Sequence, residues 1–181
     1  MALKSTIFRA DVVISDLQRN YYQKHSVTLA RHPSETDERM MMRMLAFILN
    51  ASDNLAFAQG LTSSDEPDLW EKDFTGAVSN WVMVGLPDEK YIKKACSRSQ
   101  HVIIYSYGGS AAEQWWTNIK NIAHKFDHLS IFNINQSDSS ALTNLTERTM
   151  KLDALFQDNI LWLSNAHHRI EVNLEILKYG N

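Results

Sequence analysis

WVMVGLPDEKYIKKA, residues 81–95, contains a strand, a tight corner and the start of a helix. The apolar residues 81–84 favour a buried strand, which we extend from about Ala77 to Leu86. The Gly-Leu-Pro corner predicts a sharp turn, and the lysine-rich residues after it predict a helix from Asp88 to Arg98. Corners between a strand and a helix often hold catalytic or binding groups. Met83, at the centre of the strand, decides whether this corner carries the charge that catalysis needs.

The next part of the chain predicts a β-α-β unit. HVIIYSY, residues 101–107, is typical of a strand buried on both faces, and Gly108-Gly109 turns it into a helix. Ser110 and Glu113 have the spacing of a capping box at the start of that helix. LSIFNI then resumes as a strand. A right-handed crossover with parallel strands is the expected connection.

Both ends of the chain alternate apolar and polar residues with a period of two. Residues 6–14 and 22–31, joined by the polar corner DLQRN, predict an antiparallel hairpin, and residues 149–177 predict an antiparallel meander. Between them, RHPSETDERMMMRMLAFILN predicts a helix from Ser34 to Asn50 with Ser34 as its N-cap. Glu35, Arg39 and Arg43 follow one another by one helical turn and indicate a solvated charged face.

Length and composition indicate a single domain, residues 1–181. The chain has 181 residues with 44% hydrophobic content, which suffices for a hydrophobic core. No segment has the length and apolarity of a signal peptide or a membrane span, so we expect a soluble, cytoplasmic protein without a membrane partner. A net charge of −3 argues against binding nucleic acid over the whole surface, but it does not exclude binding through a local basic patch.

Acidic and basic side chains of the central region form a candidate site for phosphodiester chemistry. Glu38 lies at the head of a predicted helix, Asp65 and Glu66 lie in a polar loop, and Lys93 and Lys94 lie on the helix after the corner. Magnesium prefers hard oxygen ligands, and a nearby lysine can stabilise the charge that develops on a phosphate. Ordinary turn chemistry and a solvated helix face are the simpler explanations of the same residues.

Six motifs resemble those of the bacterial YaeQ family, and together they run from end to end of the chain: RHPSETDERMMMRML, DEPDLW, WVMVGLPDEKYIKKA, ERTM, LWLS and EVNLE. The resemblance implies an α/β (α+β) fold, a variant of the PD-(D/E)XK nuclease architecture. Such a fold has a mixed central sheet with flanking helices, and antiparallel N- and C-terminal strands would be added to it.

The resemblance also implies where a nuclease site would lie. Its helix carboxylate would be Glu38, its loop acid Asp65 or Glu66, and its strand acid the residue at position 83. This chain has Met83 where the family pattern has a glutamate, and Gly85 where a nuclease's strand lysine would stand. A thioether is a poor ligand for a hard cation. Lys93 or Lys94 could replace the absent lysine.

Two functions follow from these expectations. The first is a non-catalytic or degenerate module that keeps a nuclease-like cleft and binds nucleic acid or a protein partner. The alternative is a Mg- or Mn-dependent phosphodiesterase, a nuclease in which Asp65 and Glu66 bind the metal and Glu38 orients metal or water. In that alternative Lys93 or Lys94 stabilises the transition state, and the damaged site binds its metal weakly. Both functions predict that these side chains converge with Met83 on one cleft.

Overall fold

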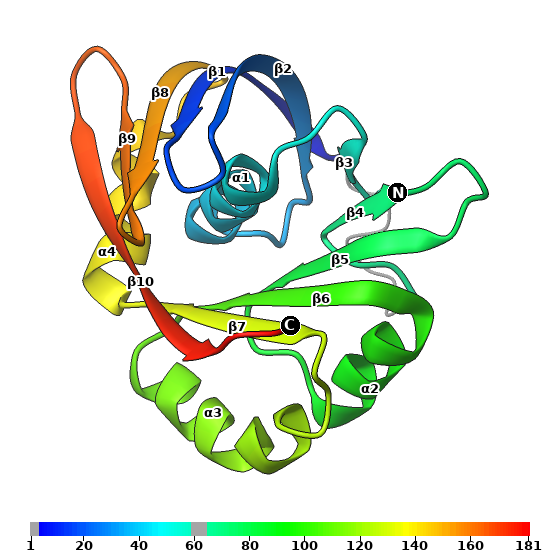
Figure 1. Ribbon diagram of the computed structural model, residues 1–181. Coiled ribbons are helices and arrows are strands. Elements are labelled where there is room, and N and C mark those ends of the chain that lie inside the picture. Colours follow the sequence, from blue (N-terminus) through cyan, green and yellow to red (C-terminus); the bar gives the residue numbers. More distant parts are fainter. Residues whose placement is uncertain (1–3, 59–64) are drawn as a thin grey trace. The chain divides into compact units, whose positions relative to one another are not determined.

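The computed structural model describes residues 4–58 and 65–181. The chain forms two compact units, and each is built from two separate stretches of sequence (Figure 1). The first unit comprises Met1–Leu49 and Ser137–Leu174, and the second comprises Asn50–Gln136 and Glu175–Asn181.

The first unit contains a sheet in the order β2-β1-β8-β9-β10. Its strands are β1 (Thr6–Asp16), β2 (Tyr21–Arg31), β8 (Thr149–Gln157), β9 (Ile160–Ser164) and β10 (Arg169–Lys178). The residues of β10 from Glu175 onward belong to the second unit. β1 and β2 pair antiparallel, as do β8 with β9 and β9 with β10. The predicted hairpin and meander are therefore confirmed. The parallel pairing of β1 with β8 joins the two ends of the chain, and periodicity alone does not indicate it.

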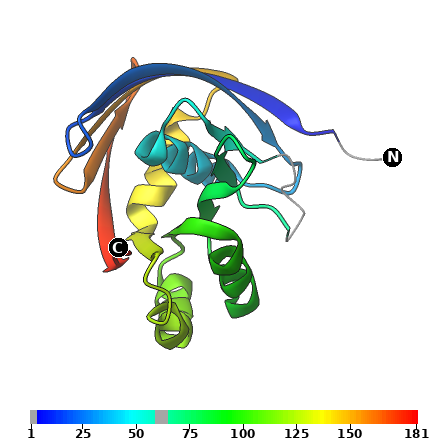
Figure 2. The same ribbon diagram turned by 45° about the vertical axis from the view of Figure 1, so that its right-hand side comes forward.

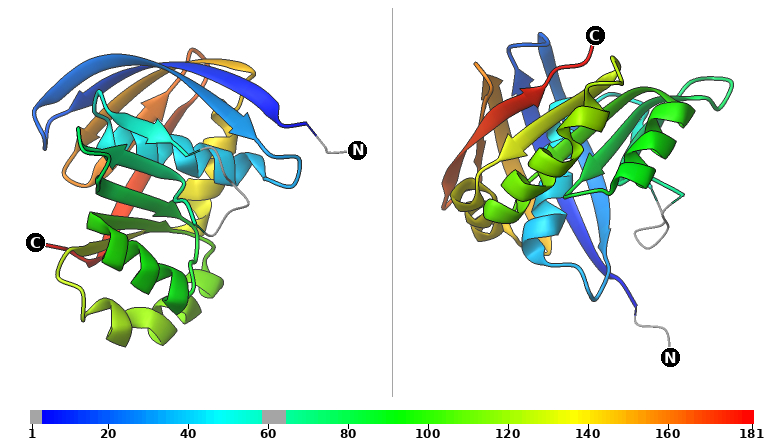
Figure 3. Two further views of the ribbon diagram at one scale, coloured as in Figure 1. Left: turned by 90° about the vertical axis from the view of Figure 1, so that its right-hand side faces the viewer. Right: turned by 90° about the horizontal axis from the view of Figure 1, so that it is seen from below.

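A helix, α1 (Asp37–Asn50), packs against the inner, concave face of this sheet (Figures 2 and 3). All its residues from Met40 to Leu49 are buried. β1 supplies alternate buried residues to the same core, from Phe8 to Ile14. A short helix, α4 (Gln136–Ala141), and a 3₁₀ turn (Leu142–Leu145) precede β8. The amphipathic pattern of these last two elements is too short to be recognised in sequence.

The second unit contains a mixed sheet with two helices on one face. Its strands are β3 (Leu55–Phe57), β4 (Leu69–Lys72), β5 (Val78–Val84), β6 (Ser99–Ser106) and β7 (Leu129–Ile134). β5, β6 and β7 are parallel neighbours, whereas β4 is antiparallel to both β5 and β3. The connecting helices are α2 (Glu89–Arg98) and α3 (Ser110–Ala123), which lie on the same side of the parallel strands (Figures 1 and 3). The predicted β-α-β unit is confirmed, and a second one precedes it.

Two predicted helix starts are wrong. Helix α1 begins at Asp37, and its cap is Thr36, whose Oγ1 accepts a hydrogen bond from the Arg39 N–H at 3.1 Å. The Ser34 hydroxyl contacts the His32 ring instead. Helix α3 is preceded by Gly109, which has a φ of 60° and provides no side-chain cap, so Ser110 is the first helical residue. In both places a neighbouring residue with suitable backbone geometry occupies the cap position.

Candidate functional site

Met83 lies in the hydrophobic core of the second unit. Its side chain is 1% exposed. It belongs to the same buried cluster as Trp81, Ile92 of α2 and Ile119 of α3. The prediction of a buried strand is therefore confirmed. The position that the family resemblance assigns to a carboxylate is filled by a side chain packed between the sheet and its helices.

Hydrogen bonds hold the corner after β5 in one conformation. Gly85 has a φ of +106°, a backbone conformation that would be strained for a residue with an L side chain. Asp88 caps α2 by accepting a hydrogen bond from the Tyr91 N–H at 2.7 Å. The indole N–H of Trp115 donates to the Pro87 carbonyl oxygen at 2.7 Å. The first turn of α2, and the lysines that follow it, are thus fixed relative to the end of β5.

The acidic segment before β4 is attached to α2. The Asp65 carboxylate, 70% exposed, forms an ion pair with Lys94, and an Arg98 Nη1 lies 4.0 Å from it. The hydrogen bond and charge of Lys94 lower the pKa of Asp65 below its ordinary value. The Glu66 carbonyl oxygen accepts a hydrogen bond from the Tyr91 hydroxyl. Both contacts place this segment beside the basic face of α2.

The two candidate lysines have different partners. Lys94 contacts the predicted metal ligand Asp65. Lys93 forms an ion pair with Glu89 of its own helix at 2.5 Å, one turn earlier. Both members of this second pair are about half exposed, so it is a surface ion pair of the kind that contributes little to stability. Of the two lysines, Lys94 is therefore the one placed beside the loop acid.

Glu38 belongs to the first unit. Its Oε1 accepts a hydrogen bond from the Ser139 hydroxyl of α4 at 2.7 Å, and Ser139 is fully buried. The contact joins the head of α1 to α4. The predicted convergence of Glu38 with Asp65 and Glu66 involves residues of different units, and it stays a prediction.

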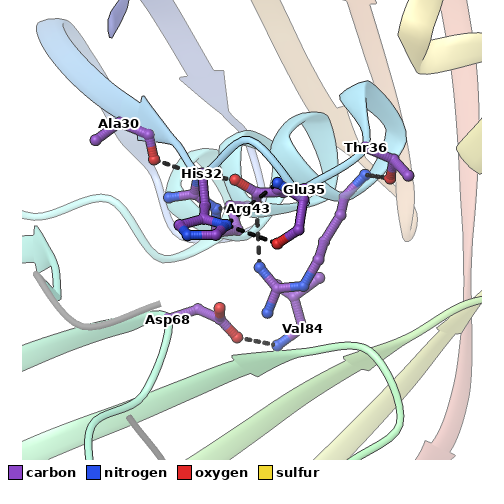
Figure 4. Close-up of polar contacts among 9 residues, drawn as sticks. Ala30, His32, Glu35, Thr36, Arg43, Asp68 and Val84 are labelled. Atoms are coloured by element: carbon purple, nitrogen blue, oxygen red, sulfur yellow. Dashed lines mark hydrogen bonds and ion pairs between the residues drawn. The ribbon is translucent and has the colours of Figure 1, made fainter. Parts of the chain in front are cut away.

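Asp68 has a structural role that the sequence does not indicate. Its Oδ2 accepts a hydrogen bond from the Val84 N–H at 2.8 Å (Figure 4). Its own N–H donates to the Val82 carbonyl oxygen at 3.1 Å. The carboxylate thus occupies the last backbone donor of β5. The pairing of Leu69 with Val82 sets this contact, and a register between strands cannot be read from the residues of one strand.

Glu35 and Arg43 form a buried ion pair, so the prediction of a solvated charged face is wrong for both residues. The Glu35 carboxylate accepts hydrogen bonds from Nε and Nη2 of Arg43, both at 2.8 Å, and from Nη1 of Arg39 at 3.0 Å. The Glu35 and Arg43 side chains are 4% and 2% exposed. Nη2 of Arg43 also donates to the Ala30 carbonyl oxygen at 3.1 Å. The cluster fastens the segment between β2 and α1.

The side chains of the second unit do not fit a magnesium or manganese centre. Among the residues that the structure describes, no three His, Cys, Asp or Glu side chains lie close enough together to hold a metal ion. Asp65 is paired with a cation, and position 83 presents a buried thioether. A hard divalent cation needs several oxygen ligands, and in this unit the candidates are Asp65 and Glu66.

Comparisons with known proteins place this mixed α/β architecture among bacterial proteins of one family. The crystal structure of the YaeQ protein from Xanthomonas axonopodis pv. citri superposes with a TM-score of 0.94 at 41% identity, covering 96% of this chain and 98% of that one. The YaeQ protein from Pseudomonas syringae gives a TM-score of 0.91 at 30% identity, with 97% of each chain covered. These are experimental structures with the same fold.

Sequence comparison leads to the same result. The family model described as "YaeQ protein" matches residues 1–174. The uncharacterized protein YaeQ of Escherichia coli K12 is 41% identical over 174 residues, which is 96% of each chain. The chain belongs to the YaeQ family, and the resemblance seen in its motifs is confirmed. No helix in the described parts of the chain combines the length and apolarity needed to cross a membrane.

Proposed function

We propose that this protein is a non-catalytic binding module, built on a variant of the PD-(D/E)XK nuclease fold in which the metal site has degenerated. The burial of Met83 carries this proposal. A strand carboxylate is the central ligand of such a site, and here that position belongs to the hydrophobic core. The ion pair of Asp65 with Lys94 adds support, because a metal would have to compete with the lysine for the same carboxylate.

The charges around α2 favour a protein over a nucleic acid as the partner. α2 carries four basic residues: Lys90, Lys93, Lys94 and Arg98. Lys93 is paired with Glu89, and Lys94 and Arg98 both lie beside Asp65. Affinity for nucleic acid comes from cations that are free to replace counterions on phosphates. Surface cations that already have carboxylate partners, on a chain with a net charge of −3, supply little of that term.

The contact between Asp65 and Lys94 also favours a second candidate, the Mg- or Mn-dependent phosphodiesterase. An acid that binds metal beside a lysine that stabilises charge is the pairing that phosphodiester cleavage uses. This candidate requires Glu38 to supply the further carboxylate, since Met83 cannot. It therefore depends on the predicted convergence of Glu38 with Asp65.

A cleavage assay separates the two candidates. We expect no Mg- or Mn-dependent cleavage of supercoiled plasmid, single-stranded DNA or RNA by the parent protein above the level of an Asp65→Ala, Lys94→Ala double variant. Asp65 is 70% exposed and Lys94 is 25% exposed, so loss of this ion pair should leave the double variant folded, and a thermal melt checks this. Cleavage that needs manganese and disappears in the double variant would establish the phosphodiesterase.

A binding assay tests the kind of partner. Fluorescence anisotropy with labelled DNA and RNA oligonucleotides should show no saturable binding at physiological salt. The matched variant is Lys90→Ala, because Lys90 is an exposed cation of α2 that forms no ion pair among the described residues. Binding that weakens steeply with salt, and weakens further in Lys90→Ala, would make nucleic acid the partner.

A further inference from the structure

β2 is an edge strand with unused hydrogen-bonding groups. In the sheet of the first unit, β1 is the neighbour of β2 on one side, and in the described part of the chain no strand pairs with its other side. β2 is 11 residues long and pairs with β1 in an unbroken register from Tyr21 to Arg31. It contains no proline, glycine or bulge. Long, regular edges of this kind are templates for pairing with another strand.

The register shows which residues of β2 face outward along this edge. In β1, the Ile7 carbonyl oxygen and the Arg9 N–H both bond to Arg148, so these residues direct their backbone groups away from β2. In an antiparallel pair, the residues opposite them must also face away. Those residues are Ala30 and Thr28. By the same alternation Ser26, Lys24 and Tyr22 direct their N–H and C=O groups to the free edge.

The side chains at these positions leave the edge accessible. Tyr22, Lys24, Ser26 and Thr28 are all exposed. In the described part of the chain their backbone groups bond to no residue of another element. The next outward carbonyl, that of Ala30, accepts a hydrogen bond from Arg43. The open edge therefore runs from Tyr22 to Thr28 and is closed beyond it by the buried Glu35–Arg43 pair.

We propose that two copies of this chain join edge to edge through antiparallel pairing of β2, forming a symmetric dimer. Antiparallel pairing of a strand with itself is isologous, so it closes after two copies and does not continue into a fibre. It would use both backbone groups of Tyr22, Lys24, Ser26 and Thr28 in each copy. Edge-facing residues must lie opposite edge-facing residues, which leaves few registers.

Charge selects one register among these. With Lys24 opposite Ser26 of the second copy, the lysine extends toward Asp11, which lies beside Ser26 on β1 and hydrogen bonds to its hydroxyl. If the second copy is shifted by one edge-facing position in one direction, Lys24 lies opposite Lys24 of the second copy. One step in the other direction places Lys24 opposite Thr28, whose neighbour on β1 is Arg9. The first alternative places like charges directly opposite each other, which destabilises a cross-strand pair. The second directs the lysine toward an arginine of β1 in place of an aspartate.

The selected register also predicts which residues of the two copies lie opposite each other. It places His25 directly opposite His25 of the second copy, at a pair without mutual hydrogen bonds, where Cα atoms are about 4.5 Å apart. Gln23 then lies opposite Val27 and is separated from Gln23 of the second copy by about four residues along the strand, or about 13 Å. A cysteine at position 25 can therefore form a disulfide with the same cysteine of the second copy, whereas a cysteine at position 23 cannot.

The first test is the mass of the full-length protein in solution. A single pair of edges buries less surface than the roughly 1,000 Å² of a stable interface, so we expect a concentration-dependent dimer with a dissociation constant on the order of micromolar or weaker. Sedimentation from about 1 µM to about 500 µM should show this equilibrium. Ser26→Pro removes an outward N–H without breaking a backbone hydrogen bond to β1, and it should weaken dimerisation at least tenfold. The variant also loses the hydroxyl that bonds to Asp11, and the Ser26→Ala control loses the same group. Ser26→Ala keeps the N–H, and its dimer should persist.

The second test is disulfide trapping under mild oxidation. His25→Cys should form a covalent dimer, and Gln23→Cys should remain monomeric. The native Cys96 is buried, and burial raises its pKa to about 11, so it does not compete. A parent protein that is monomeric throughout the concentration range would overturn the proposal. So would a dimer that Ser26→Pro leaves intact, or equal trapping at positions 23 and 25.

Discussion

Met83 shows how one residue separates a fold from its chemistry. A methionine is unbranched and fills irregular space, so it completes the cluster between β5 and the helices α2 and α3. A glutamate in the same place would have to keep its carboxylate hydrated or bound to a cation. The cluster offers neither, because its other members are apolar and buried.

Substitution of Met83 tests this interpretation. Met83→Glu should lower the free energy of unfolding by about 3 kcal/mol or more, because it buries a carboxylate without a partner. Met83→Leu, the matched control, conserves volume and should cost less than about 1.5 kcal/mol. Urea denaturation measures both. If manganese restored the lost stability of Met83→Glu, a latent metal site would exist at position 83 and the binding-module proposal would fail.

At the scale of elements, the segment between β2 and α1 is held by charges in the protein interior. Glu35 precedes α1, while Arg39 and Arg43 lie on it, and Arg43 also reaches the carbonyl oxygen of Ala30 at the end of β2. A buried ion pair gains stability only when its hydrogen bonds are complete. Arg43 meets this condition with two bonds to the carboxylate and a third to the backbone.

The two arginines of this cluster should differ in their contribution to stability. Arg43→Ala should cost about 3–5 kcal/mol, because it leaves the Glu35 carboxylate largely uncompensated in the interior. Arg39 is 31% exposed, and Arg39→Ala should cost about 1 kcal/mol or less. Chemical denaturation of both variants gives the comparison. Equal costs would mean that Glu35 is solvated, as the spacing of these residues in the sequence predicts.

At the scale of the whole molecule, the proposed function predicts a weak response to metal. A ligand that binds the folded state with a dissociation constant near 1 mM adds only about 0.4 kcal/mol at about 1 mM concentration. For a chain of this size that is a rise in Tm of about 1 °C. Thermal melts with and without manganese should therefore nearly coincide. A rise of several degrees that is lost in Asp65→Ala would show a functional metal site.

Most of the elements, and the family, can be inferred from the residues alone. The pleat of a half-buried strand enforces alternation with a period of two, so the patterns of residues 6–14, 22–31 and 149–177 suffice to predict the hairpin and the meander. The Gly-Leu-Pro corner and the parallel strands around α3 follow from local backbone chemistry. The six motifs identify the YaeQ family, which the comparisons confirm. A single domain over residues 1–181 and a cytoplasmic location stay predictions.

Which charges are buried, and which residues meet, depends on the three-dimensional fold. Glu35 and Arg43 have the spacing of a surface pair, and their burial depends on how the segment after β2 folds over α1. Lys93 and Lys94 are adjacent in sequence, yet one pairs along its helix and the other with Asp65, which lies 29 positions earlier. β1 lies between β2 and β8, which is more than a hundred residues away in the chain, and no described strand pairs with the second side of β2. Periodicity shows which face of an element is apolar, but the partner of a charge or of an edge is set by contacts between residues far apart in the chain.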